Sequence, residues 1–130
     1  MSNDIIMIEI GLKHESQTVV GPNNTAQSLG SGDMEVFATP AMVALMENAA
    51  MLAVAPHLDE GASTVGVEMN TSHIKASPMG ATITASAELT TIEGRKLSFK
   101  VKAWDEQGVI GEGYHTRFIV DRERFLSKIK

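Results

Sequence analysis

The second half of the chain alternates between apolar and polar residues, a pattern typical of β-strands with one face exposed to water. In residues 81–91 alanine, isoleucine and leucine alternate with threonine, serine and glutamate, and residues 97–104 alternate in the same way. Residues 109–120 read as a further strand. Turn sequences separate the three segments, EGRK at 93–96 and DEQG at 105–108. The pattern therefore predicts three consecutive antiparallel strands joined by hairpins.

The first half predicts fewer strands and one long helix. Residues 7–20 are expected to supply one or two strands, and residues 63–76 another. The segment 21–35 is rich in glycine, asparagine and serine and is expected to be a loop. Asp121 is a candidate N-cap for a short helix over residues 121–130. The predicted order is strand, loop, helix and then four strands.

The helix expected over residues 40–54 is apolar on every side, apart from Glu47 and Asn48 at its centre. Such a helix has to be buried on every side, and a curved antiparallel sheet wrapped around it meets that need. We therefore predict an α+β protein with the hot-dog fold, formed by residues 1–130 as a single domain. Because such a sheet has open edges, we expect a homodimer, or a dimer of such dimers.

Composition and charge narrow the function classes. The chain has 130 residues, no cysteine and a formal net charge of -5. The missing cysteines exclude disulfides, a cysteine nucleophile and thiolate metal sites, and the acidic balance argues against nucleic acid as a partner. The N-terminus lacks the basic start of a signal peptide, and no apolar run reaches the ~20 residues of a membrane span. We expect a cytoplasmic protein that does not enter a membrane.

Glu47 is the residue in the helix that most needs an explanation. Burial of a carboxylate without a partner is costly, and such groups concentrate at functional sites. A structural role is equally compatible with the pattern: Glu47 could reach solvent at a dimer seam or pair with a basic residue. Asn48 beside it is ambiguous in the same way.

Thr39 also has two interpretations. A threonine before Pro40 is a standard helix start, with the threonine as N-cap, and from the pattern alone this is the better interpretation. In the alternative, its hydroxyl binds an oxygen of a substrate. Thr39 and Glu47 are eight residues apart, about 12 Å along a helix, so they cannot bond to each other within it. If both act, the substrate lies along the helix or two subunits contribute.

The histidines give no metal signature. His14 and His57 read as structural or surface residues, His115 lies on a predicted strand, and His73 lies near the end of another. A lone histidine on such a face is more often a core residue than a catalyst. No pair of histidines has the spacing of a zinc site, and neither a nucleophile elbow nor a phosphate-binding glycine loop is present.

Several segments together resemble a known family. The run VFATPAMVALMENAA, the segment TSHIKASPMG and the stretches EGRKLS and GYHTR are similar to the hot-dog-fold acyl-CoA thioesterases, in particular to the family of the fluoroacetyl-CoA thioesterase. The resemblance extends from about Gly11 to Lys128. It implies hydrolysis of an acyl-CoA thioester to a carboxylate and free CoA, without a metal or other cofactor.

The resemblance also implies roles for individual residues. Glu47 would be the nucleophile or the general base, His73 the acid/base, and Thr39 the residue that orients the carbonyl or Glu47. Gly66 would help to hold the thioester oxygen through its backbone N–H, and Arg117 would lie near the site.

Two features of the substrate site follow from the same comparison. The phosphates of CoA need basic residues, and Arg117, Lys75, Arg95 and Lys96 are candidates by charge. Where the fluoroacetyl-selective enzyme has aromatic residues, this chain has Gly30 and Asp33 within a polar loop. The pocket is therefore expected to be more open and more polar, and the sequence does not predict fluoroacetyl selectivity.

Two other functions are compatible with the same fold. An enoyl-CoA hydratase or dehydratase would carry an Asp or Asn with a His in a hydratase motif, which this sequence lacks. Alternatively, Glu47 and His73 satisfy each other in a protein that binds acyl-CoA or another hydrophobic ligand without converting it. Turnover of saturated acyl-CoA would argue against both.

Overall fold

One antiparallel sheet forms most of the computed structural model, which describes residues 8–130. The sheet is five-stranded, in the order β1-β3-β4-β5-β2. Its strands are β1 (Lys13–Val19), β2 (Ala62–His73), β3 (Thr82–Glu93), β4 (Lys96–Asp105) and β5 (Gly108–Asp121). The three strands predicted in the second half form a meander in the middle of the sheet. This leaves β1 and β2 as the two edges.

The helices agree with the sequence pattern except in the loop before the long helix. That helix is α2 (Thr39–Val54), continued by the 3-10 turn η1 (Ala55–His57), and the last helix is α3 (Arg122–Ser127). The side chain of Asp121 accepts a hydrogen bond from the N–H of Arg124, which confirms the predicted cap. The predicted loop instead contains a short helix, α1 (Ala26–Leu29), which Thr25 and Ser28 start with a reciprocal capping box.

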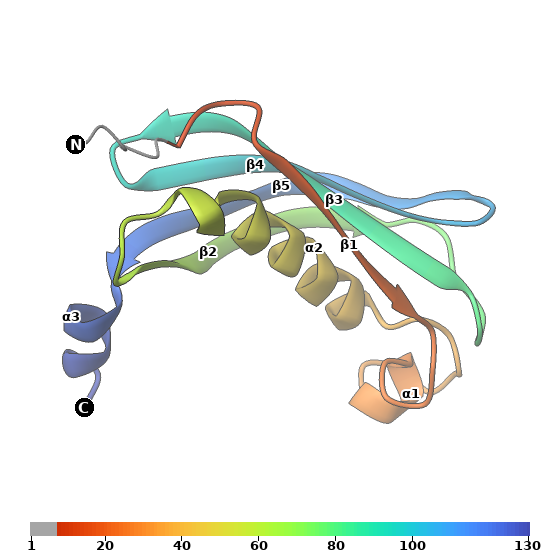
Figure 1. The fold of residues 1–130 in the computed structure, drawn as a ribbon. Coiled ribbons are helices and arrows are strands. Elements are labelled where there is room, and N and C mark those ends of the chain that lie inside the picture. Colours follow the sequence, from red (N-terminus) through yellow and green to blue (C-terminus); the bar gives the residue numbers. More distant parts are fainter. Residues whose placement is uncertain (1–7) are drawn as a thin grey trace.

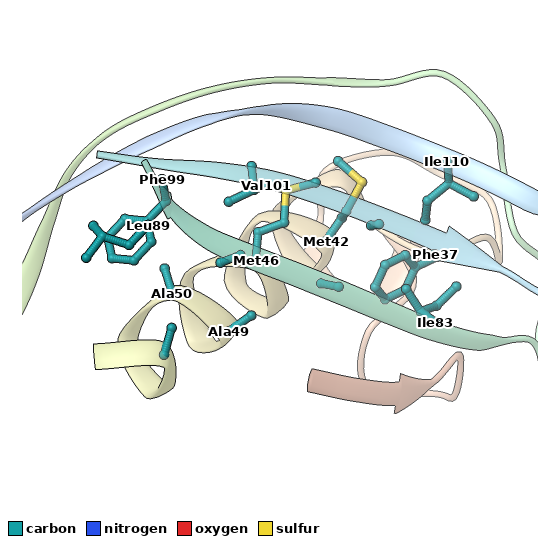
Figure 2. Packing of buried hydrophobic residues seen from close by; sticks show 14 of the residues in the cluster. Phe37, Met42, Met46, Ala49, Ala50, Ile83, Leu89, Phe99, Val101 and Ile110 are labelled. Atoms are coloured by element: carbon teal, nitrogen blue, oxygen red, sulfur yellow. The ribbon is translucent and has the colours of Figure 1, made fainter. Parts of the chain in front are cut away.

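The curved sheet wraps around one side of α2, which is the hot-dog fold (Figure 1). Met42 and Met46 of α2 point toward the strands, and they belong to one buried cluster with Leu89, Phe99 and Val101 (Figure 2). Ala49 and Ala50 are fully buried and bring the helix backbone close to the sheet. Flexible methionines fill the irregular space that remains between a straight helix and a twisted sheet.

The sequence-based prediction that α2 is buried on all sides is wrong for the single chain. Ala44, Asn48 and Leu52 are exposed and Glu47 is half-buried. One five-stranded sheet covers only one side of a helix, so much of the opposite apolar side has no partner within residues 8–130. The Oδ1 of Asn48 accepts a hydrogen bond from Ser16 at 2.6 Å, which ties α2 to β1.

The structure bears on the expectation that no segment could span a membrane, but not on the expectations for the first seven residues. By length and composition alone, the helical stretch Thr39–His57 would suffice to cross a membrane, contrary to the sequence-based expectation. A core helix meets the same criterion, and this one packs its methionines against the sheet. The expectations for residues 1–7, the start of a first strand and the absence of a signal peptide, lie outside the described residues.

A buried carboxylate anchors the segment that follows β2. Asp105, at the end of β4, accepts hydrogen bonds from Lys75 Nζ and Ser77 Oγ, each at 2.8 Å, and from the N–H of Gln107. Burial by itself would raise the pKa of Asp105, but these bonds and the charge of Lys75 outweigh it and lower the pKa to about 2. The cluster holds residues 75–77, which begin two positions after His73, against the end of the sheet.

We expect Asp105→Asn to destabilise the fold by about 2 kcal/mol at neutral pH, because each unit of pKa shift corresponds to ~1.4 kcal/mol. A folded-state pKa below the unfolded value means that this stabilisation is present above about pH 4 and is lost as the pH falls toward 2. Denaturant unfolding at pH 7 and pH 3 measures both effects. The variant should show a smaller loss of stability on acidification, whereas the exposed control Glu112→Gln should behave like wild type. An unchanged acid slope in Asp105→Asn would contradict this assignment.

Candidate active site

Glu47 lies on the side of α2 that faces the edge strand β2. Its Oε2 is 2.8 Å from the point where a Cβ on Gly66 would lie, closer than ordinary side-chain packing permits. The register of β2 against β5 shifts between Gly66 and Glu68, so the strand bulges at this point. Glycine at position 66 thus lets the strand backbone approach the carboxylate. The family resemblance implies a different role for this residue, in which its backbone N–H holds the thioester oxygen.

Arg117 reaches the same point from β5. Its side chain is buried, and it donates from Nε to Thr64 Oγ1 at 2.8 Å and from Nη2 to the Thr64 carbonyl at 3.0 Å. The remaining nitrogen, Nη1, is 3.2 Å from the position of a Gly66 Cβ. Burial lowers the pKa of Arg117 and the nearby charge of Glu47 raises it. The guanidinium stays protonated at neutral pH, and it places a positive charge near the Glu47 side chain.

His115 completes this group of side chains, although the sequence did not single it out as functional. Its Nε2 is 3.2 Å from Arg117 Nη1 and its Nδ1 is 2.7 Å from the Glu68 carbonyl oxygen. His115 and Arg117 are two residues apart on one strand, so their side chains point to the same face. The two-residue spacing from Arg117 could have indicated in the sequence that His115 lies at the site. It becomes informative only when the structure places Arg117 beside Glu47.

Thr39 and His73 form a second group at the N-terminal end of α2. Thr39 Oγ1 and His73 Nδ1 are 2.8 Å apart. The prediction that Thr39 is the N-cap is wrong: the N-cap is Ala38, which has no side-chain bond to the helix. Because the helix starts one residue earlier than expected, the hydroxyl of Thr39 lies within the first turn and is free to bond His73.

The two ring nitrogens of His73 differ, because Nδ1 is hydrogen-bonded to Thr39 and Nε2 is not. Nε2 is buried and has no hydrogen-bond partner within residues 8–130, which is uncommon for a buried polar atom. The edge of the ring meets Phe37 with centroids 6.4 Å apart. Burial lowers the pKa of His73, and the backbone of Lys75 counteracts this in part. The imidazole is therefore mostly neutral at pH 7, with Nε2 available for proton exchange with a ligand.

A hollow of about 270 Å³ opens beside His73. Two residues of the predicted loop contribute to its wall, and the others lie just before or at the start of α2 and at or just after the end of β2. Its lining comprises Ala26, Ser31, Val36, Phe37, Thr39, His73, Ile74, Lys75 and Ala76. Gly30 and Asp33, which were expected to make the pocket more open and polar, are exposed and do not line this hollow. Small side chains therefore face this hollow on the side of α1.

The structure does not bring all five predicted site residues together in one chain. Glu47, Gly66 and Arg117 meet near the middle of α2, and Thr39 and His73 meet at its start. The two groups are separated by eight residues of helix, or about 12 Å. No hydrogen bond joins Glu47 to His73 among the described residues. Within one copy, therefore, these two side chains do not satisfy each other as the non-catalytic alternative supposes.

Comparisons with known proteins agree with this arrangement. The family described as fluoroacetyl-CoA-specific thioesterase matches residues 20–123. The fluoroacetyl-CoA thioesterase of Streptantibioticus cattleyicolor is 37% identical over 129 residues, which cover 95% of this chain and 93% of that protein.

The chain belongs to the fluoroacetyl-CoA-specific thioesterase family.

Solved structures support the same conclusion for the fold. The crystal structure of a single-residue mutant of the fluoroacetyl-CoA-specific thioesterase has a TM-score of 0.87 at 38% identity, covering 94% of this chain and 95% of that one. A thioesterase superfamily member from Thermus thermophilus has a TM-score of 0.86 at 27% identity, covering 94% and 90%. The sequence-based predictions of the hot-dog fold and of an acyl-CoA thioesterase are confirmed.

The basic residues expected to bind the CoA phosphates are not equally free to do so. Lys75 is paired with Asp105, Arg117 is buried beside Glu47, and Lys96 lies 3.9 Å from Glu93. Arg95 lines a separate hollow of about 170 Å³ with Arg124 and Lys128. Residues 8–130 contain no cluster of three or more His, Cys, Asp or Glu that could hold a metal ion.

Proposed function

We propose that this protein hydrolyses short acyl-CoA thioesters at a site shared between two copies of the chain. The observation that supports this most directly is the separation of its two reactive groups. Glu47 with Gly66 and Arg117 lies too far from Thr39 and His73 to act on one carbonyl within a single chain. Both groups nevertheless border the same edge strand, β2, whose outer side has no strand partner in the described chain.

Antiparallel pairing of β2 with its copy would unite the two groups. A two-fold axis between Met69 and Asn70 places Gly66 of one copy opposite His73 of the other, because these residues are equally far from the axis along the strand. The unpartnered side of α2 would then lie beside the second copy. Val67, which is 55% exposed on this edge, supports the same interface. The homodimer predicted from the sequence thus becomes part of the proposed site.

Each group then has a distinct task in the reaction. Glu47 attacks the thioester carbonyl as nucleophile, or removes the proton of a water that does so. The backbone N–H of Gly66 helps to bind the developing oxyanion. His73 donates a proton from Nε2 to the departing thiolate of CoA, and Thr39 holds the other ring nitrogen so that Nε2 faces the sulfur.

The hollow beside His73 supports a short acyl chain as substrate. The fluoroacetyl-CoA thioesterase is named for a fluoroacetyl group. Gly30 and Asp33 supply no aromatic side chain to the loop at residues 21–35, so we propose that acetyl-CoA and other short acyl-CoAs are accepted alongside fluoroacetyl-CoA. We also propose that the protein acts in the cytoplasm, which the lack of cysteine supports.

Release of free thiol from a panel of acyl-CoAs tests this function. The panel holds fluoroacetyl-CoA, acetyl-CoA, saturated chains from propionyl-CoA to octanoyl-CoA, and one enoyl-CoA assayed for hydration. We expect hydrolysis of the short saturated thioesters and no hydration. Hydration without thiol release would replace the proposal with the hydratase alternative, and binding of the thioesters without turnover would replace it with the non-catalytic one. A strong preference for fluoroacetyl-CoA would overturn the selectivity proposed here.

A further inference from the structure

We propose that His115 is a positioning residue: as a neutral imidazole protonated on Nδ1, it fixes Arg117 and the bulge of β2 against Glu47. The inference rests on the proposed function, in which Glu47 reacts and Arg117 accompanies its charge. His115 itself does not contact the substrate in this account. It acts through the side chain of Arg117 and the backbone of Glu68.

The chemistry of its two neighbours determines the protonation state of His115. A guanidinium has only donors, so at the 3.2 Å contact with Arg117 Nη1 the Nε2 of His115 has to accept. A carbonyl oxygen has only acceptors, so at the 2.7 Å contact with Glu68 the Nδ1 has to donate. Both contacts are satisfied only by the neutral ring with its proton on Nδ1. The charged form and the other neutral tautomer each place two donors or two acceptors against one another.

The surroundings of the ring favour this neutral state. His115 is 1% exposed, and its ring lies against Phe99 with centroids 6.2 Å apart. Burial has the largest influence and lowers the pKa of His115, and the charge of Arg117 acts in the same direction. The Glu68 carbonyl and the charge of Glu47 raise the pKa but are outweighed.

The position of the His115 ring affects Arg117, the bulge of β2 at Gly66 and the approach of both to Glu47. Arg117 is already held by Thr64 at Nε and Nη2, so the contact with His115 fixes the remaining nitrogen, Nη1. Around the point where a Gly66 Cβ would lie, Glu47 Oε2, His115 Cε1 and Arg117 Nη1 are at 2.8, 3.1 and 3.2 Å. Because these atoms are packed together, a shift of the ring moves Arg117 and the β2 bulge relative to Glu47.

Three substitutions separate the two bonds of His115. His115→Phe keeps an aromatic ring against Phe99 and loses both bonds. His115→Asn keeps a donor near the Glu68 carbonyl, and His115→Gln can carry an acceptor to Arg117. We expect the phenylalanine and asparagine variants to lower kcat on the order of 10- to 100-fold with little change in KM, since small misplacements of reacting groups have such effects. The glutamine variant should recover most of kcat.

The melting temperature and an NMR measurement distinguish positioning from a general structural role. If His115 only stabilised the fold, kcat would follow the melting temperature, and glutamine would rescue no better than asparagine; either result would overturn the proposal. Long-range proton–nitrogen spectra of the wild type should show His115 neutral with the proton on Nδ1 from pH 6 to pH 8. A ring protonated on Nε2 would also overturn it. A wild type without thioesterase activity would instead refute the proposed function.

Discussion

Glu47→Gln is expected to lower kcat for thioester hydrolysis by about 10²–10⁴-fold, the range in which a positioned acid or base contributes. The amide has nearly the same shape as the carboxylate, but it is neither a nucleophile nor a base at neutral pH. Glu47 is half-buried and packs beside the backbone of Gly66, so the variant should fold. Steady-state thiol release and a binding assay with a non-hydrolysable acyl-CoA thioether measure both parts of the expectation.

The matched control for this substitution is Glu60→Gln. Glu60 is exposed, follows η1, and makes no side-chain hydrogen bond or salt bridge within residues 8–130, so its loss should leave kcat unchanged. A Glu47→Gln variant that keeps more than about a tenth of wild-type kcat would contradict a reactive role, because loss of a catalytic base costs far more. Glu47 would then be a structural partner of Arg117.

Gly66→Ala is expected to have the second largest effect. An added Cβ would lie 2.8 Å from Glu47 Oε2, 3.1 Å from His115 Cε1 and 3.2 Å from Arg117 Nη1, and all three would have to move. Overpacking of this kind costs typically about 1–3 kcal/mol of stability. Because the displaced atoms belong to the reacting carboxylate and its cation, we also expect kcat to fall by about 10²-fold.

Gly21→Ala controls for the substitution itself. Gly21 has no atom closer than 3.9 Å to an added Cβ and no positive φ, so alanine there should change neither stability nor kcat. Unfolding curves and steady-state rates of both variants give the comparison. If Gly66→Ala were as stable and as active as Gly21→Ala, the close approach of β2 to Glu47 would not be a requirement of the site.

The sheet could be predicted from the sequence because its pattern is local. Alternation from Ala81 onward, with turn sequences at 93–96 and 105–108, determines which face of each strand is buried and where the chain reverses. The cap at Asp121 was predicted for the same reason, since an N-cap depends on residues within one turn of the helix.

Features that depend on distant residues were not predictable in this way. Thr39 has the local signature of an N-cap, but its hydroxyl bonds His73, which lies 34 residues further along the chain. His115 looked like an ordinary core histidine because its partners, Glu68 and Arg117, meet it only when β2 pairs with β5. The exposed side of α2 differs from the prediction because the pattern of one chain does not separate burial by its own sheet from burial by a second copy.

In the proposed dimer, one reactive site combines Glu47 of one copy with Thr39 and His73 of another. Mixed dimers of two inactive variants, Glu47→Gln and His73→Asn, test it most directly by thiol release from the best substrate of the panel. Random mixing makes about half of the dimers mixed, and each mixed dimer then has one site with both wild-type groups. The matched control mixes wild type with the double variant Glu47→Gln/His73→Asn, in which every mixed dimer has one fault in each shared site.

We predict that the mixture of the two single variants recovers about a quarter of wild-type activity, and that the mixed dimers of the control contribute almost none. The opposite pattern, no recovery in the first mixture and active mixed dimers in the second, would show that Glu47 and His73 act within one chain. That result would contradict the shared site.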